Sequence, residues 1–305
     1  MNRLNLVTAL LAIATPVQLA AAPSAAIQTQ SAAEVRLPHI SVVRTGTGPG
    51  LVFIPGLGSP RASWDKVVVG LAARHTVYLV QVNGFGGDAP GANLKPGILN
   101  GIVGDLSKYL KREKAGPVKL IGHSMGGLAG MMFVAAHPDQ VEKLMIVDAL
   151  PYFPVLLARG GPEPTPAQVE PIARMMRDTV AARFGKPVDP AAVKRDVDGL
   201  AVKPESRVQM AVWAAAADPR VTAELLYEDM STDLRPKLAA MKLPITVVAP
   251  WSATGFTKER TMAFYGRQYA AAPNVTYVDI ADAGHFVMLD QPIAFRAALD
   301  AFVGR

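Results

Sequence analysis

Apolar residues follow two alternating patterns along the chain, short continuous runs and longer stretches with helical spacing. The continuous runs end at Gly, Pro, Asn or Asp in most cases, and they cover residues 51–54, 76–82, 118–121, 144–147, 245–249 and 275–280. Continuous apolar runs are typical of strands buried on both faces. Helical spacing lies between them, at residues 61–73, 98–114, 125–137, 256–272 and 292–302. Strand followed by helix, repeated, predicts an α/β fold with a mostly parallel central sheet flanked by helices.

One long stretch, residues 151–240, departs from this alternation. It has no convincing strand, and its apolar residues repeat at helical spacing, at Val169, Ile172, Met176, Val180, Phe184, Val193, Val197, Leu200, Val221, Leu225 and Leu226. Pro and Gly separate these segments. We expect a helical cap over the strand ends, inserted into an α/β core of residues 36–150 and 241–305. Its Met and aromatic residues are expected to form core rather than to ligate a cofactor.

The N-terminal segment has the three parts of a secretory signal peptide. A short basic start is followed by a mostly apolar run over residues 4–14 and by small residues at 20–22. The run is too short to span a bilayer comfortably, although an uncleaved membrane anchor is the alternative. We expect cleavage after residue 22, or as late as 26, and a flexible leader over residues 23–35. The mature protein is then periplasmic or secreted, without stable membrane association.

Composition narrows the range of chemistry. Half of the 305 residues are hydrophobic, which is enough for a buried core. There is no cysteine, so disulfides, thiolate metal sites and a cysteine nucleophile are excluded. The net charge is +6, but Lys and Arg are scattered and form no basic stripe. We therefore expect no nucleic-acid partner. The sequence does not indicate the oligomeric state.

A Gly-x-Ser-x-Gly pattern occupies residues 122–126, with Ser124 at its centre. It follows an apolar strand and opens a predicted helix, which is the context that a nucleophile elbow requires. The sharp turn strains the backbone at the serine, and flanking glycines avoid clashes. The turn also directs the N–H groups of the helix start at any negative charge that develops there. This context predicts a nucleophilic Ser124, against the alternative of a glycine-rich turn with an incidental serine.

A serine hydroxyl needs a base to act at neutral pH. Four of the five histidines are poorly placed: they lie near the leader, before a strand, inside the elbow with the side chain directed away, and at a helix end (His39, His75, His123 and His137). The fifth, His285, follows the last strand, at the carboxyl edge where sites form in α/β sheets. Elimination predicts His285 as the base, with an ordinary surface histidine as the alternative.

From about residue 51 to residue 305, the sequence resembles the α/β-hydrolase superfamily, and within it serine hydrolases of esterase or lipase type that carry a helical cap. Beside the elbow and His285, residues 83–87 (Asn-Gly-Phe-Gly-Gly) resemble the glycine-rich loop after the fourth strand. Residues 233–236, leading into 243–244, resemble the return from cap to core. The resemblance implies an oxyanion hole made of two backbone N–H groups, those of Leu57 and Met125. Residues 55–56 read Pro-Gly where the family often has His-Gly.

The acid member of the triad is less obvious. In the family it commonly follows the penultimate strand, but residues 250–255 contain no carboxylate and Glu259 falls on a predicted helix. Some members place the acid one strand earlier, which here implies Asp148. The alternative for Asp148 is a turn or helix cap. Asp282 and Asp290 are weaker candidates, and Asp290 is expected to cap the final helix.

The resemblance implies hydrolysis of a carboxylic ester through an acyl-enzyme on Ser124, with His285 as base and Asp148 as its partner. No cofactor or metal is expected, and the partner is a small apolar ester. Candidate pocket residues near the site loops and in the cap are Trp64, Phe85, Tyr152, Phe153, Trp213, Trp251 and Phe286. Lactone hydrolysis, carbon–carbon bond hydrolysis, aminopeptidase activity, a cofactor-free haloperoxidase-like or lyase reaction, and a non-catalytic binding protein stay open.

Overall fold

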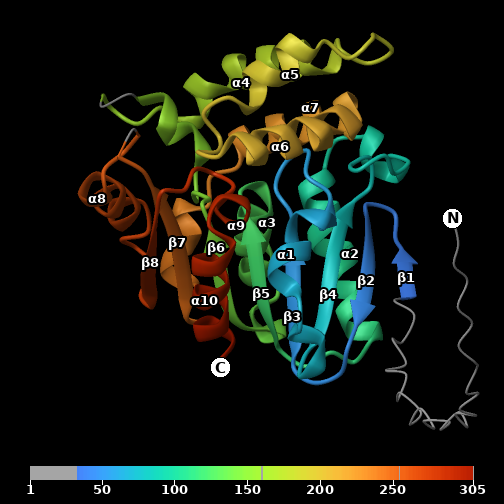
Figure 1. Ribbon diagram of the computed structural model, residues 1–305, viewed down its shortest axis with the longest axis vertical. Helices are drawn as coiled ribbons and strands as arrows, with labels where there is room; N and C mark the ends of the chain where they lie inside the picture. The colour runs from blue at the N-terminus through green and yellow to red at the C-terminus, as the bar shows by residue number, and fades with distance from the viewer. Residues whose placement is uncertain (1–32, 159–160, 254, 305) are drawn as a thin grey trace, which may run out of the picture. The chain divides into compact units, whose positions relative to one another are not determined.

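A computed structural model describes residues 33–158, 161–253 and 255–304. The signal peptide expected at residues 1–22 and the leader up to residue 32 lie outside the described residues. One eight-stranded sheet runs through the molecule in the order β1-β2-β4-β3-β5-β6-β7-β8. The strands are β1 (Ala33–Arg36), β2 (Ile40–Thr45), β3 (Gly50–Ile54), β4 (Thr76–Val82), β5 (Val118–His123), β6 (Val141–Val147), β7 (Ile245–Trp251) and β8 (Val275–Ala281). Strands β3 to β8 are parallel, which confirms the α/β prediction (Figure 1).

The first two strands were not predicted. Strand β2 pairs antiparallel with both β1 and β4. Strand β1 occupies residues expected to belong to a flexible leader, so that expectation is wrong for residues 33–35. Its sequence, Ala-Glu-Val-Arg, contains no apolar run. It is held instead by the pairing of Glu34 with Val43 and by a hydrogen bond from Arg61 to Glu34 (2.8 Å). Such contacts between distant residues leave no local pattern.

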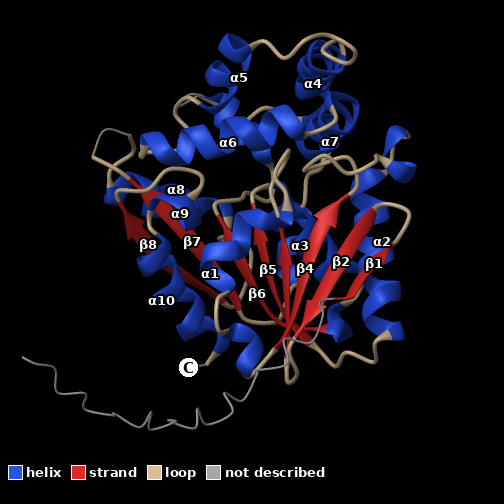
Figure 2. Ribbon diagram, turned by 45° about the vertical axis from the view of Figure 1, so that its right-hand side comes forward, coloured by secondary structure: helices blue, strands red, loops and turns tan. Residues whose placement is uncertain are grey.

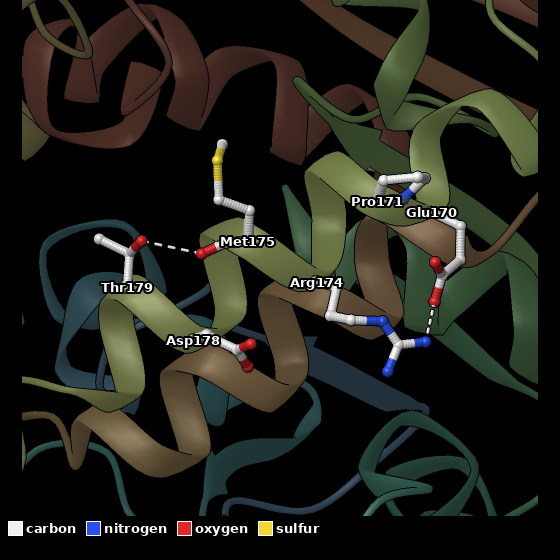
Figure 3. Close-up of a pocket in the computed structure, with 6 residues that line it drawn as sticks. All are labelled: Glu170, Pro171, Arg174, Met175, Asp178 and Thr179. Carbon is white, nitrogen blue, oxygen red and sulfur yellow. Dashed lines mark hydrogen bonds and ion pairs between the residues drawn. The ribbon is translucent and has the colours of Figure 1, made fainter.

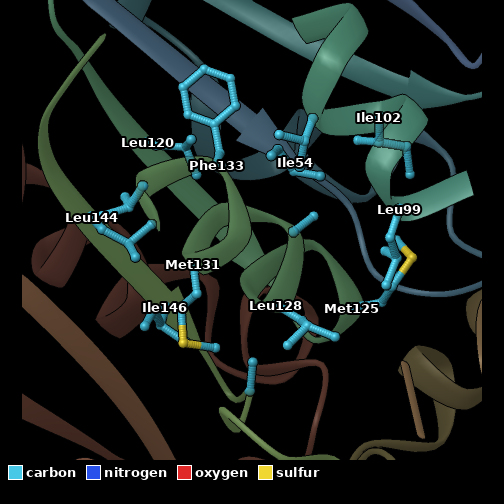
Figure 4. Close-up of a cluster of buried hydrophobic side chains, with 14 of the residues drawn as sticks. Ile54, Leu99, Ile102, Leu120, Met125, Leu128, Met131, Phe133, Leu144 and Ile146 are labelled. Carbon is cyan, nitrogen blue, oxygen red and sulfur yellow. The ribbon is translucent and has the colours of Figure 1, made fainter. Parts of the chain in front are cut away.

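Helices cover both faces of the sheet, which explains the continuous apolar runs. On strand β3, Val52 and Ile54 point into one buried cluster, whereas Leu51 and Phe53 point into the other. Helices α2 (Ile98–Arg112), α3 (Met125–Ala136) and α8 (Lys258–Gln268) pack on the first face, and α1 (Asp65–Val68), α9 (Val287–Asp290) and α10 (Pro292–Val303) on the second. Figure 4 shows Met131 of α3 beside Ile146 of β6.

The helix expected over residues 61–73 is broken. Two short 3-10 turns, residues 61–64 and 71–73, flank the four-residue helix α1. Gly70 separates the second turn from α1 with φ +76°, a left-handed conformation that ends a helix. The apolar positions keep helical spacing, and Trp64, Val67 and Leu71 are all buried against the sheet. The apolar spacing therefore predicts correctly which side chains are buried, but the prediction of one continuous helix is wrong.

A layer of helices lies between β6 and β7 in the sequence and above the carboxyl ends of the strands in space (Figures 1 and 2). It consists of α4 (Pro166–Ala181), α5 (Pro190–Val197), α6 (Pro204–Ala216) and α7 (Pro219–Ser231). Each begins with proline, whose fixed φ suits the first helical position. The two ends of this cap meet, because the Leu234 N–H donates to the Pro151 carbonyl (2.8 Å). Within the described part of the chain, no helix combines the length and apolar character needed to cross a membrane.

Candidate active site

Ser124 sits at the turn from β5 into α3, with φ +54°, in a region that non-glycine residues rarely adopt. The flanking glycines are required by close packing. A Cβ on Gly122 would collide with the Gly126 carbonyl oxygen, and a Cβ on Gly126 would collide with the carbonyl oxygens of Ile54 and Pro55 on the neighbouring strand. The Ser124 N–H also donates to the Val147 carbonyl at the end of β6 (3.0 Å). The turn is therefore fixed by backbone on both sides.

Asp148 and His285 are brought together at the same edge of the sheet. His285 Nδ1 lies 2.7 Å from Asp148 Oδ2, and the Tyr265 hydroxyl from α8 donates to Asp148 Oδ1. Burial raises the pKa of Asp148, but the charge of His285 and hydrogen bonds from His285 and Tyr265 outweigh burial and hold that pKa below its usual value. An ionised Asp148 accepts a hydrogen bond from Nδ1–H, which leaves His285 Nε2 without a proton and free to act as a base.

The loop that carries His285 is held by two buried side chains. His123 Nε2 lies 2.8 Å from the His285 carbonyl oxygen. Burial, together with the nearby His285, lowers the pKa of His123 to about 3, so His123 stays neutral and donates this hydrogen bond. On the other side of the loop, the Gly284 N–H donates to Asp290 Oδ2 (2.9 Å).

Asp290 does not cap the final helix, contrary to the sequence expectation. Gln291 occupies the position before α10, and its side chain makes no capping hydrogen bond. The fully buried Asp290 carboxylate accepts instead from the N–H groups of Val202 (2.8 Å) and Lys203 (3.1 Å) as well as from that of Gly284. It thus ties the segment between α5 and α6 to the His285 loop. The sequence places Asp290 beside the helix start but carries no sign of these distant donors.

The loop after β3 runs against Ser124. A Cβ built on Gly56 would lie 2.8 Å from His123 Nδ1 and 3.1 Å from the Ser124 Cβ, so a larger residue at this position would displace one of these side chains. The N–H of Leu57 has no hydrogen-bond acceptor among the described residues. The N–H of Met125 belongs to the first turn of α3, where helix geometry leaves such groups unpaired. The Met125 side chain itself is buried in the core.

A cavity of about 1050 Å³ lies between the core and the cap, and both Ser124 and His285 border it. The two side chains are not hydrogen-bonded to each other in the described structure. Most of the wall is apolar and comes from the cap, including Met176, Val180 and Leu226. At the end formed by α5 and the segment before it, the wall carries the ion pair between Arg183 and Asp196. Size and lining suit a small, largely apolar molecule.

The predicted pocket residues divide into two groups. Phe153, Trp213 and Phe286 line the cavity, as does Leu57. The other four do not, and their assignment to the pocket is corrected here. Trp64 packs against Phe53 and Phe295, Phe85 and Tyr152 are fully buried, and Trp251 donates its indole N–H to Asp279 (3.0 Å). Aromatic residues beside site loops serve the core as readily as a pocket, and sequence position does not separate the two uses.

A second depression, of about 620 Å³, lies on the outer side of α4 (Figure 3). Its polar side chains pair with one another, with the neighbouring Arg177 or with the helix backbone. Glu170 pairs with Arg174, and the Thr179 hydroxyl donates to the Met175 carbonyl (2.8 Å). It therefore offers few free groups to a ligand.

Three residues near the catalytic cavity were not singled out from the sequence: Tyr265, His123 as a support for the His285 loop, and Asp229. Asp229, on α7, lines the cavity although it is only 8% exposed. A signal for Asp229 is present in the sequence. It follows Leu225 and Leu226 by four and three residues, so a carboxylate interrupts the apolar face of a helix. Tyr265 has no comparable signal, because its role depends on contact with Asp148.

Comparisons with known proteins agree with this geometry. A family model described as alpha/beta hydrolase family matches residues 51–298. A pimeloyl-(acyl-carrier protein) methyl ester esterase of Aeromonas hydrophila is 33% identical over 114 residues, which make up 37% of this chain and 43% of that protein. The chain thus spans less than half the length of that relative. An esterase of Mycobacterium tuberculosis is 29% identical over 282 residues, covering 87% of this chain and 88% of that protein.

Among solved structures, a thermophilic esterase from Thermogutta terrifontis superposes with a TM-score of 0.72 at 21% identity, over 89% of this chain and 98% of that one. This similarity shows the fold. The family match extends over most of the chain and includes the Ser124 elbow, Asp148 and His285. The chain therefore belongs to the alpha/beta hydrolase family.

Proposed function

We propose that the protein is a serine carboxylesterase that acts on small apolar esters by a Ser124-His285-Asp148 mechanism. The observation that carries the proposal is the 2.7 Å contact between Asp148 and His285, at a cavity that Ser124 also borders. Asp148 fills the acid position, although it follows β6 rather than β7. The esterases of Aeromonas hydrophila and Mycobacterium tuberculosis among the relatives support this class of reaction.

The reaction proceeds through a covalent acyl-enzyme. Ser124 Oγ attacks the ester carbonyl while His285 Nε2 takes its proton, and Asp148 stabilises the imidazolium and fixes the ring. The Leu57 and Met125 N–H groups hold the oxyanion, where the loss of one donor costs about 3 kcal/mol. The intermediate collapses, and the alcohol leaves with the proton from His285. Water then attacks the acyl-enzyme with His285 again as base, which releases the carboxylic acid and restores Ser124.

The test is hydrolysis of p-nitrophenyl esters of increasing acyl length by the wild type and by Ser124→Ala. We expect turnover by the wild type and a loss of at least about 1000-fold in Ser124→Ala with unchanged thermal stability. Ser206→Ala, which removes a buried hydroxyl of α6 outside the cavity lining, is the matched control. Turnover that survives Ser124→Ala contradicts the proposal. Inactivity on every ester, with turnover of a lactone or a carbon–carbon substrate, would replace it with one of those activities.

We also propose that the protein is exported. The basic start, apolar run and small residues of positions 1–22 support this. Expression in a Gram-negative host followed by fractionation and N-terminal sequencing tests it. A soluble periplasmic product beginning after residue 22 or 26 is expected, whereas an intact N-terminus in the cytoplasm or membrane fraction contradicts it.

A further inference from the structure

The cavity contains a buried carboxyl group that the ester mechanism does not use. Asp229 lies on α7 of the cap and lines the same cavity as Ser124 and His285. Only 8% of the residue is exposed. Its carboxylate takes part in no hydrogen bond and no ion pair with any residue in the described part of the chain. Its oxygens therefore depend on whatever occupies the cavity.

Unlike Asp229, the other buried carboxylates accept hydrogen bonds from the protein. Three Asp or Glu residues in the described structure are more than nine-tenths buried: Asp105, Asp229 and Asp290. Asp105 accepts from both the backbone N–H and the ring of His39, at 2.8 and 3.0 Å. Asp290 accepts from three N–H groups, at 2.8 to 3.1 Å. Since a buried carboxylate without a partner is costly, Asp229 is the exception that needs an explanation.

Neighbouring charged groups do not offset the cost of burying the Asp229 carboxylate. His285 is the one group whose charge lowers its pKa, and burial outweighs that effect, raising the pKa to about 7. On the same helix, Glu228 points elsewhere and accepts from the N–H groups that begin α2, at Ile98 (2.8 Å) and Leu99 (2.7 Å). The cationic Arg183, which also lines the cavity, is already paired with Asp196. The partner of Asp229 is thus not in the protein.

We propose that Asp229 binds a hydrogen-bond-donating group of the substrate, a hydroxyl or a protonated amine, carried a few bonds away from the ester. This proposal rests on the proposed esterase function and narrows its substrate class from plain apolar esters to hydroxy or amino esters. A donor at this point supplies the hydrogen bond that the carboxyl group lacks, while the apolar wall takes up the remaining carbon atoms. Trp213 and Phe286, with ring centroids 6.3 Å apart, line the same cavity, and aromatic rings also stabilise a bound ammonium group.

The test compares esters of one shape that differ in a single group. The alcohol series is 3-methylbutyl, 3-hydroxy-3-methylbutyl and 2-(dimethylamino)ethyl butanoate. The acyl series is methyl 5-methylhexanoate and methyl 4-(dimethylamino)butanoate. We expect the wild type to prefer at least one polar ester over its apolar counterpart by about tenfold or more in kcat/KM. In Asp229→Leu this ratio of kcat/KM values falls to about one.

Two variants sharpen the result. Asp229→Asn keeps an acceptor but loses the charge, so it retains a preference for the hydroxy ester and abolishes a preference for the amino ester. Glu224→Gln removes a carboxyl group from the same helix outside the cavity lining, and its ratios should equal those of the wild type. Wild-type ratios near one in both series, or ratios that persist in Asp229→Leu, overturn the proposal.

A binding measurement separates this proposal from the esterase function. Thermal unfolding is followed with 3-methylbutanol, 3-methylbutane-1,3-diol or 2-(dimethylamino)ethanol present at equal concentration. Selective protection by a polar alcohol that disappears in Asp229→Leu supports the Asp229 site even if no ester is hydrolysed. Turnover of p-nitrophenyl butanoate without any selectivity in either assay would keep the esterase function and overturn the Asp229 site.

Discussion

The two sides of the cavity differ in how tightly they are packed. We call the side around Ser124 the floor and the side formed by helices α4 to α7 the roof. The floor, around Ser124, is fixed by backbone: glycines at 56, 122 and 126 let chain segments approach so closely that a Cβ cannot fit without a clash or displacement. The roof, helices α4 to α7 with their connections, leaves large apolar side chains open to solvent, with Met175, Phe184, Val188, Val208 and Val212 all more than half exposed. Close packing allows one geometry, whereas a loosely packed layer tolerates substitution.

This contrast separates two tasks. The groups that we propose act on the ester lie in the floor, where close backbone contacts resist displacement. Most of the cavity wall, which would select one ester from another, comes from the roof. Changes to the floor should therefore affect all substrates alike, and changes to the roof should affect some more than others.

The largest effect is expected at the acid. Asp148→Asn keeps the shape, but its amide oxygen accepts from Tyr265 and its NH2 group faces His285 Nδ1, so the ring adopts the wrong tautomer. We expect kcat to fall by about 10³ to 10⁴ on every ester, with little change in thermal stability. Asp282→Asn is the matched control, since Asp282 lies in the loop that carries His285 and, like Asp148, has a positive φ (+53° and +45°) that asparagine tolerates. A loss below about tenfold in Asp148→Asn would assign the acid role elsewhere.

The next effect concerns the close approach beneath Ser124. In Gly126→Ala, the new Cβ meets backbone oxygens of β3 and the following residue, which cannot move without displacing the strand. We expect roughly 1 to 3 kcal/mol of lost stability and a loss of activity of about 100-fold. In the control, Gly104→Ala, the Cβ enters open space on α2, and stability should stay equal or rise. Equal behaviour of the two variants in urea unfolding would refute a rigid floor.

Much of this floor could be predicted from the sequence, because its signals are local. The apolar runs mark β3 to β8, and the pattern around Ser124 requires a particular turn. His285 is predicted from its place after the last strand and Asp148 from the resemblance to the family, and the two lie 2.7 Å apart. Other features depend on residues far apart in the chain, so local periodicity does not predict them. They are the β1–β2 pairing, the contacts of Asp290, and the different places of two tryptophans, Trp64 in the core and Trp213 at the cavity.

A smaller effect is expected where floor and roof are joined. Asp290→Leu leaves three N–H groups of the cap linker and the His285 loop without an acceptor, so we expect about 2 kcal/mol or more of lost stability. His285 should also be less well placed, which lowers kcat about tenfold at temperatures well below the unfolding midpoint. Asp290→Asn can still accept from Val202 and Gly284 and should retain most of both. If Asp290→Leu unfolds earlier but keeps its kcat, the link is structural only.

The smallest expected effect concerns the roof alone, and it is a change in the pH dependence of thermal stability. Burial raises the pKa of Asp229 to about 7, well above the usual value of about 3.9 for aspartate. The folded protein thus holds this proton more tightly than the unfolded chain, and the stability it gives is full below about pH 4 and lost as the pH rises to about 7. We expect Asp229→Asn to unfold at a higher temperature than the wild type at pH 8, by about 3 °C or more, and to lose that advantage near pH 4. A constant difference across this range would contradict a buried proton at Asp229.

The hydrogen bond between Leu234 and Pro151 has a consequence for how such proteins diversify. The first and last residues of the cap are in contact. The cap therefore connects β6 to β7 between two neighbouring points, whatever its length or sequence. Closing a longer loop between the same two points costs the core little extra entropy. A different helical cap could therefore replace residues 151–234. We expect such a protein to keep the geometry around Ser124 and to bind different ligands.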